Sequence, residues 1–177
     1  MKSLLLSAFF LLAVMHSVKA QDIKVSAGPE ILRSFNFTEV FYGWGGSAQA
    51  TWWVRSTLGL GINSGYYHFQ SNTALIGANK FPTYSMIPVF FVVRYPIPVF
   101  EGLYGQDMFG YSFTQDVQLL KADKAVTGGF TYYFALGYVI HNHFDLSLKV
   151  GRTRLNKKND TVNVNEHNVG LKLAYIF

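Results

Sequence analysis

Residues 164–177 read Val-Asn-Glu-His-Asn-Val-Gly-Leu-Lys-Leu-Ala-Tyr-Ile-Phe and alternate with a period of two. Apolar side chains occupy every second position, at Val169, Leu171, Leu173, Tyr175 and Phe177. Small or polar residues lie between them, at Asn168, Gly170, Lys172 and Ala174. This alternation predicts a β-strand with one apolar face. Such a face either packs on a second sheet in a soluble sandwich or contacts lipid in a membrane-spanning barrel.

Seven earlier stretches show the same alternation, at about residues 22–33, 43–54, 58–69, 83–95, 101–113, 127–140 and 144–154. The connections between them alternate in length: 34–42, 70–82, 114–126 and 155–163 are long, whereas 55–57, 96–98 and 141–143 are short. A membrane barrel whose ends face different compartments has this rhythm, with short turns on the periplasmic side. We therefore predict an all-β, eight-stranded antiparallel up-and-down transmembrane β-barrel. An even number of strands places both termini on the periplasmic side.

The composition supports a barrel and excludes several functions. Apolar residues make up 50% and aromatic residues 17% of the chain, which suits a barrel with aromatic girdles at its two rims. The absence of cysteine excludes disulfides and thiolate metal sites. Without residues 1–20 the charge is 15 − 2 = 13 cations against 10 anions, about +3, which is too small to indicate nucleic-acid binding.

The first twenty residues predict a cleaved signal peptide. Lys2 precedes an apolar run over residues 4–15, and Val18-Lys19-Ala20 offers the small residues that a signal peptidase requires. A membrane anchor is the alternative, but the run is shorter than the ~20 residues that a spanning helix needs. We expect a signal peptide over residues 1–20 and one barrel domain over residues 21–177.

Several stretches together resemble a known family. They are residues 24–30 (KVSAGPE), 45–50 (GGSAQA), 58–67 (LGLGINSGYY), 87–89 (IPV) and 169–177 (VGLKLAYIF). The chain resembles the small outer-membrane-protein β-barrel domain family, related in shape to the OmpA and OmpX barrels, over nearly all of residues 21–177. The resemblance implies a place in the outer membrane of a Gram-negative bacterium and no catalytic residue or cofactor.

The last strand also resembles the terminal strand that the barrel assembly machinery recognises in these proteins. Its signal is polar-x-Gly-x-x-apolar-x-apolar, which Asn168, Gly170, Leu173 and Tyr175 fit with an offset of two from Phe177.

The parity of the strands predicts a polar interior. The inward positions include Lys24, Glu30, Gln49, Asn63, Arg94, Asp145, Lys149 and Lys172. Unpaired buried charges are costly, so charges of both signs should find each other. Because the first strand closes on the last, we expect Glu30 to pair with Lys172, and Lys149 to share this carboxylate. Asp145 and Arg94 are expected to pair less directly. Side chains should fill so narrow a lumen and leave no water channel.

Three residues fit the predicted strands badly. Pro29 and Pro88 lie inside strands, where each removes a hydrogen-bond donor, so we expect a bulge or distortion at one of them. Asp107 has outward parity, and a carboxylate facing lipid is unfavourable. A register shift near residues 105–108 is therefore expected.

Candidate binding and catalytic residues are few. His141 and His143 could form a weak metal site, but a solvated turn is the preferred interpretation, so no metal is expected. His68 and His167 lie near the outer ends of non-neighbouring strands, without a nucleophile motif. A cluster of cations, Arg152, Arg154, Lys157 and Lys158, could contact glycolipid phosphates, or could belong to a loop that is merely solvated.

We therefore expect a non-enzymatic, monomeric outer-membrane barrel with a structural or surface-interaction role. Its partners would be membrane lipid, glycolipid headgroups and the assembly machinery, with no nucleic acid and no cofactor. The alternative is a small porin or a transport conduit for small or apolar solutes.

Overall fold

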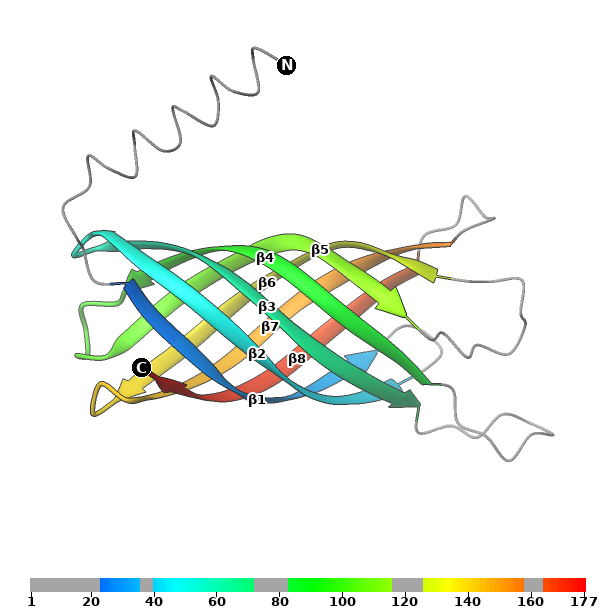
Figure 1. The fold of residues 1–177 in the computed structure, drawn as a ribbon, viewed down its shortest axis with the longest axis horizontal. Coiled ribbons are helices and arrows are strands. Elements are labelled where there is room, and N and C mark those ends of the chain that lie inside the picture. The colour runs from blue at the N-terminus through cyan, green and yellow to red at the C-terminus, as the bar shows by residue number, and fades with distance from the viewer. Residues whose placement is uncertain (1–22, 36–39, 72–82, 116–125, 158–163) are drawn as a thin grey trace, which may run out of the picture.

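The computed structural model describes residues 23–35, 40–71, 83–115, 126–157 and 164–177. These residues form eight strands: β1 (Ile23–Phe35), β2 (Val40–Arg55), β3 (Leu58–Ser71), β4 (Thr83–Pro96), β5 (Leu103–Gln115), β6 (Val126–Ile140), β7 (Phe144–Lys157) and β8 (Val164–Ile176). Each strand pairs antiparallel with its neighbours in the chain, and β1 pairs with β8 to close the barrel (Figure 1). The predicted fold is confirmed. No described segment is a helix long and apolar enough to cross a membrane.

The three short connections lie at the end of the barrel where β1 begins and β8 ends (Figure 1). His141 and Asn142 have left-handed backbone angles, φ 48° and 61°, in the tight turn between β6 and β7. The turn between β4 and β5 is longer than expected and runs over residues 97–102. The amide of Ile97 donates to the carbonyl of Leu103 across it at 2.9 Å. The predicted signal peptide and most of the long connections lie outside the described residues.

The strands present apolar side chains outward and polar side chains inward, with the predicted parity throughout the described side chains. Outward residues are well exposed, as at Ile62 (62%) and Leu173 (49%), whereas inward Asn168 and Lys172 are buried. A soluble protein rarely exposes so continuous an apolar surface, but lipid covers the same surface in a membrane barrel. The soluble-sandwich interpretation of the last strand is therefore excluded.

Neither proline causes the expected bulge. The pairing of β1 with β8 passes from Ala27↔Tyr175 to Glu30↔Lys172 and omits Gly28 and Pro29, yet its register is unchanged. The pairing of β3 with β4 omits Pro88 in the same way. The distortion is a gap in one ladder at each proline, because proline has no amide hydrogen to donate.

Register shifts occur instead between Trp53 and Arg55 and between Val126 and Gly129. The second contains Gly128 with φ +105°, a backbone conformation that only glycine adopts readily.

The register shift expected near Asp107 is also absent. Asp107 pairs regularly with Val93 and Phe134 and its side chain is exposed on the outer face. It forms a hydrogen bond with Tyr95, whose ring lies over Gly105. Because Tyr95 precedes the last residue of β4, this carboxylate lies near the rim that carries the short turns. A charge on the lipid face costs only about 0–1 kcal/mol near an interface, so the regular register is tolerated.

We predict that replacing Gly45 with valine impairs barrel closure. A Cβ at Gly45 would lie 2.0 Å from the backbone oxygen of Tyr66 on β3, and a backbone atom cannot rotate away. Overpacking of this kind costs about 1–3 kcal/mol. The measurement is the fraction of protein that refolds in detergent, read from the mobility difference between heated and unheated samples. Ala48→Val, on the exposed outer face of the same strand, is the control. Equal refolding of both variants would contradict the prediction.

Candidate functional site in the barrel interior and at the outer rim

Charged side chains of both signs are buried inside the barrel in equal numbers. They are the carboxylates Glu30, Asp145 and Glu166 and the cations Arg94, Lys149 and Lys172, each between 3% and 7% exposed. Moving one ion from water to a protein interior costs several kcal/mol unless an opposite charge and hydrogen bonds compensate it. Among the described residues the interior is therefore close to neutral, and its charges are arranged in separate clusters.

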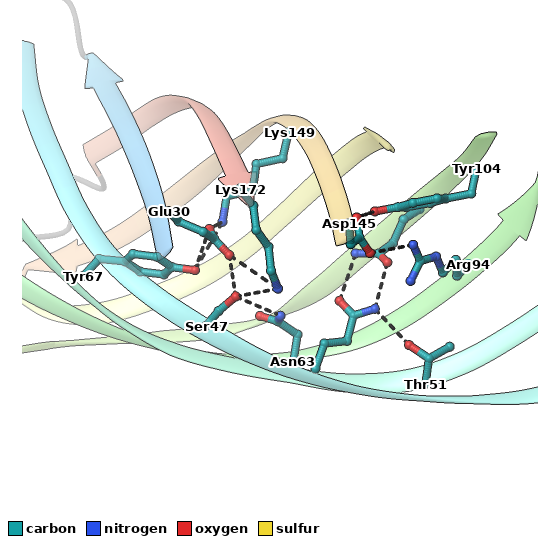
Figure 2. Close-up of polar contacts among 12 residues, drawn as sticks. Glu30, Ser47, Thr51, Asn63, Tyr67, Arg94, Tyr104, Asp145, Lys149 and Lys172 are labelled. Atoms are coloured by element: carbon teal, nitrogen blue, oxygen red, sulfur yellow. Dashed lines mark hydrogen bonds and ion pairs between the residues drawn. The ribbon is translucent and has the colours of Figure 1, made fainter. Parts of the chain in front are cut away.

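The first cluster, the Glu30 cluster, joins side chains from five strands. Glu30 on β1 accepts hydrogen bonds from Lys149 Nζ on β7, from Ser47 Oγ on β2 and, at 2.8 Å, from the Tyr67 hydroxyl on β3 (Figure 2). Lys172 on β8 lies with Nζ 3.8 Å from Glu30 Oε1 and donates to Ser47 Oγ at 2.9 Å. The expected pairing of Glu30 with both lysines is present, and it connects strands that are distant in sequence.

The second cluster, the Asp145 cluster, lies nearer the end of the barrel that carries the short turns. Arg94 on β4 donates from one terminal nitrogen to Asp145 Oδ2 on β7 at 2.7 Å, and the hydroxyl of Tyr104 on β5 donates to Asp145 Oδ1. The guanidinium carbon lies 3.4 Å from the centre of the Tyr104 ring, a cation–π contact. The expectation of a less direct pairing was wrong, because the tilt of the strands brings these two side chains to the same level.

Two amides cross the lumen beside these clusters. Gln49 on β2 and Gln106 on β5 exchange hydrogen bonds of 2.9 and 3.2 Å, and Gln49 also donates to Thr51 Oγ1 at 2.9 Å. Asn63 donates to Ser47 Oγ at 3.4 Å. The cavity among these groups has a volume of only about 10 Å³, close to the minimum for one water molecule. The lumen is therefore filled at this level.

An apolar layer lies next to the Glu30 cluster, on the side away from the short turns. It consists of Leu32, Phe41, Tyr67, Phe69, Tyr84 and Met86. The rings of Phe69 and Tyr84 stack with centroids 4.6 Å apart. Glu166 on β8 accepts hydrogen bonds from the Tyr84 hydroxyl at 2.9 Å and from Ser34 Oγ at 3.1 Å. The sequence analysis missed Glu166, although its parity is that of Asn168 and would have placed it inside.

Lys24 has inward parity but does not join a cluster. It is exposed at the mouth of the barrel that carries the short turns, where it lines an open recess of about 190 Å³ with Trp53 and Arg94. The predicted polar network therefore separates into buried members and one residue that water reaches.

A serine that the sequence analysis did not identify lies beside His68 on the outer face. Nδ1 of His68 is 3.3 Å from Ser85 Oγ, which also accepts a hydrogen bond from the Tyr66 hydroxyl at 2.9 Å. Ser85 is only 3% exposed, and no described carboxylate contacts His68. His167 is far along the barrel wall on β8, where it stacks on Phe35. A covered hydroxyl beside a histidine with no acid partner is a poor nucleophile.

The remaining candidate residues lie at the two rims. Arg152 and Arg154 project from β7 on the outer face of the barrel, near its outer end. For Lys157 only the backbone is described, and Lys158 lies outside the described residues. His143 stacks on Tyr175 at the end that carries the short turns, and the described part of the chain holds no group of three possible metal ligands.

The residues of the expected assembly signal lie on both faces of the last strand. Asn168 and Gly170 occupy inward positions of β8, Leu173 and Tyr175 are exposed on its outer face, and Phe177, which directly follows β8, is also exposed.

We predict that Glu30→Gln destabilises the barrel strongly. The substitution leaves Lys149 and Lys172 buried beside a neutral amide, and breaking a buried ion pair costs about 3–5 kcal/mol. The free energy of unfolding, measured by urea titration in detergent micelles, should fall by this amount. The double variant Glu30→Gln/Lys149→Met restores a balance of charges and should recover part of the loss, whereas Lys24→Gln at the exposed mouth should change little. A Glu30→Gln protein as stable as the parent would contradict the prediction.

No protein-family model matches the sequence, and no curated protein matches it significantly. Solved structures do match. Ail of Yersinia pestis, solved with the heparin analogue sucrose octasulfate, is 11% identical and aligns with 89% of this chain and 100% of its own, with a TM-score of 0.59. Neisserial surface protein A is 13% identical over 88% of this chain and 97% of its own, with a TM-score of 0.57.

The outer membrane protein OprG of Pseudomonas aeruginosa is 12% identical over 90% of this chain and 97% of its own, with a TM-score of 0.54. At such low identity these similarities establish the architecture alone. Together with the closed eight-stranded sheet, they show that the chain has the fold of the small outer-membrane β-barrels.

Proposed function

We propose that the protein is a non-enzymatic barrel in the outer membrane of a Gram-negative bacterium, with a structural or surface-interaction role and a lumen that solutes do not cross. The observation that carries this proposal is the filled interior, in which the Asp145 cluster, the Glu30 cluster and the apolar layer follow one another along the barrel. On this proposal both termini are periplasmic, residues 1–20 are removed as a signal peptide, and the monomer is the functional form.

The proposed outer-membrane location is supported by the apolar outer surface of the barrel and by the proteins whose structures are similar. The outward residues form an apolar wall, and the structurally similar proteins include two that are outer-membrane or surface proteins by name. Strand β8 carries the residues expected to be read by the barrel assembly machinery, with Tyr175 and Phe177 in contact at 5.2 Å between ring centroids.

The alternative function is transport of small or apolar solutes through the lumen. A pore needs a continuous open path, but Arg94 and Asp145 are paired across the lumen, and the carboxylate of Glu30 is occupied by Lys149 and Lys172 on the neighbouring strands. The recess at the periplasmic mouth ends at Arg94 and Tyr104, which belong to the Asp145 cluster. These contacts favour a closed barrel over a conduit.

We predict that the protein produces no current steps in a planar lipid bilayer. Eight-stranded barrels have an interior just wide enough for side chains, whereas sixteen-stranded porins leave an aqueous channel and serve as the positive control. Phe69→Ala alone and Glu30→Ser/Lys149→Ser alone should also stay closed, because each leaves the other two of the three layers intact. Stepwise conductance of the parent protein, above that of a protein-free membrane, would contradict the closed lumen and favour the transport function.

The proposal that the protein is not an enzyme has its own test. Incubation of the pure protein with outer-leaflet glycolipid should leave the acyl chains unchanged in mass spectrometry, since Ser85 is covered and His68 has no described acid partner. If the parent protein releases an acyl chain and the Ser85→Ala variant does not, this part of the proposal is refuted. If the Ser85→Ala variant releases the chain as well, the activity comes from a contaminating enzyme.

A further inference from the structure

The open recess at the end of the barrel that carries the short turns combines apolar walls with a cationic floor. We call it the mouth recess. Its volume is about 190 Å³, which is the volume of about six water molecules in the liquid. Its lining comes from β1, β2, β4, β5, β6 and β8 and from the turns at Gly102 and Asn142. The recess is therefore a small site that the closed barrel assembles from segments distant in sequence.

The walls of the mouth recess are largely apolar. Trp53, Val139 and Ile176 line it at inward positions of β2, β6 and β8. Trp53 pairs with Gly59 on β3, and a Cβ at Gly59 would lie 3.4 Å from the Trp53 ring. The ring therefore lies over the glycine, along the inner wall, and leaves the middle of the mouth open. A space of this size between such walls suits one compact apolar group, such as a single aromatic ring.

Arg94 forms the cationic floor of the recess. Its side chain is only 7% exposed, one terminal nitrogen donates to Asp145, and the Tyr104 ring covers the guanidinium (Figure 2). The other guanidinium nitrogens have no partner among the described residues. They are also absent from the described polar atoms that are both buried and unpaired, so they are open to solvent. Because Arg94 lines the recess, these N–H groups are available to a ligand there.

A buried hydroxyl in the lining supplies a second donor. Thr51 is 2% exposed, and its Oγ1 accepts a hydrogen bond from Gln49 at 2.9 Å. Within the described structure this hydroxyl donates to no other group, so its hydrogen is free for a ligand. The residues that line the recess include no aspartate or glutamate, since Asp145 lies outside the lining. The described lining thus offers N–H and O–H donors and a cation, which is the chemistry that an anionic group requires.

We propose that the mouth recess binds a small organic carboxylate. Its carboxylate accepts hydrogen bonds from Arg94 and Thr51, and its compact apolar group lies against Trp53 and Val139. A guanidinium suits this task because its planar fork matches the two oxygens of a carboxylate. Lys24 lies at the entrance and adds electrostatic attraction, but the site does not depend on it.

The inference goes beyond the proposed function, and it is compatible with a closed lumen. The recess ends at Arg94 and Tyr104, so a ligand can bind at this mouth without crossing the barrel. Two sources share the required chemistry: a free aromatic acid, and the C-terminal residue of a peptide whose last side chain is apolar.

The test titrates the folded, isotope-labelled protein in detergent micelles with benzoate and follows its tryptophan indole N–H signals by NMR. The chain has three tryptophans, and the Trp53 signal is identified by its loss in Trp53→Phe. This signal should move and saturate, whereas those of Trp44 and Trp52 on the outer wall should stay in place. Benzyl alcohol has the same ring without the charge and should move the Trp53 signal little at the same concentration.

Variants of the floor and the wall test the assignment. Arg94→Gln/Asp145→Asn replaces the ion pair by two amides of similar shape and should weaken benzoate binding at least tenfold, since the charge-assisted contact is lost. Val139→Trp fills the recess and should abolish binding. Arg55→Gln removes an exposed cation at the same end that does not line the recess, and should bind benzoate like the parent.

Three results would overturn the proposal: no saturable shift of the Trp53 signal, equal binding of benzyl alcohol, or undiminished binding by Val139→Trp. Displacement of benzoate by an equal concentration of inorganic phosphate would also overturn it, because the site would then take any small anion. If the double variant does not fold, Arg94→Lys replaces it. This variant keeps the charge beside Asp145 but loses the planar fork, and should bind benzoate several-fold more weakly.

A competition experiment distinguishes the two sources of the carboxylate. A short peptide that ends in phenylalanine with a free carboxylate is added to the benzoate complex. Displacement of benzoate would support a peptide terminus as the ligand, and its absence would support a free acid. Equal displacement by the same peptide with an amidated end would contradict the role given to the carboxylate.

Discussion

The pairing of β1 with β8 is the constraint on which the rest of the structure depends. Within lipid an unpaired strand edge would leave a row of amide and carbonyl groups without partners, so a spanning sheet has to close. The same pairing sets Glu30 opposite Lys172 in register and brings Lys149, one strand further, into reach. Closure therefore completes the backbone hydrogen bonds and compensates the buried charge in a single step. The interruption of this ladder at Pro29 is tolerated because the register on both sides is the same.

Closure with only eight strands makes the interior narrow, and this decides how the inward residues are used. Large inward side chains such as Tyr67 and Tyr133 fit because glycines lie beside them, and a Cβ at Gly151 would lie 2.5 Å from the Tyr133 ring. The remaining space is taken by ion pairs and amides that cross the barrel. An interior arranged in this way gives rigidity and leaves the outer wall and rims as the surfaces available for interaction.

The described outer wall also carries charged residues, which lie near its two edges. Asp107 with Tyr95 is close to the edge with the short turns, and Arg152 with Arg154 is close to the opposite edge. Charges are least costly where water and headgroups begin, so these positions are compatible with a membrane-spanning wall. The carboxylate of Asp107 is held by Tyr95, and the two arginines line a recess together with Phe130, Tyr132 and Asn165.

Periodicity alone determined the number of strands, the face of each described side chain and the order of the connections, because a period of two is a local property of the chain. It also identified Glu30 and Lys172 as partners, since closure in an even, up-and-down barrel makes the first and last strands neighbours. The direct contact of Arg94 with Asp145, the bonds of Glu166 and the meeting of Arg152 with Tyr132 were decided by the tertiary structure. They depend on strand tilt and register, which set the level at which distant strands meet. A bulge or distortion at one of the two prolines and a register shift near Asp107 were expected. The register is regular at all three residues, because the energy of many regular pairs outweighs one missing bond or one charge near an interface.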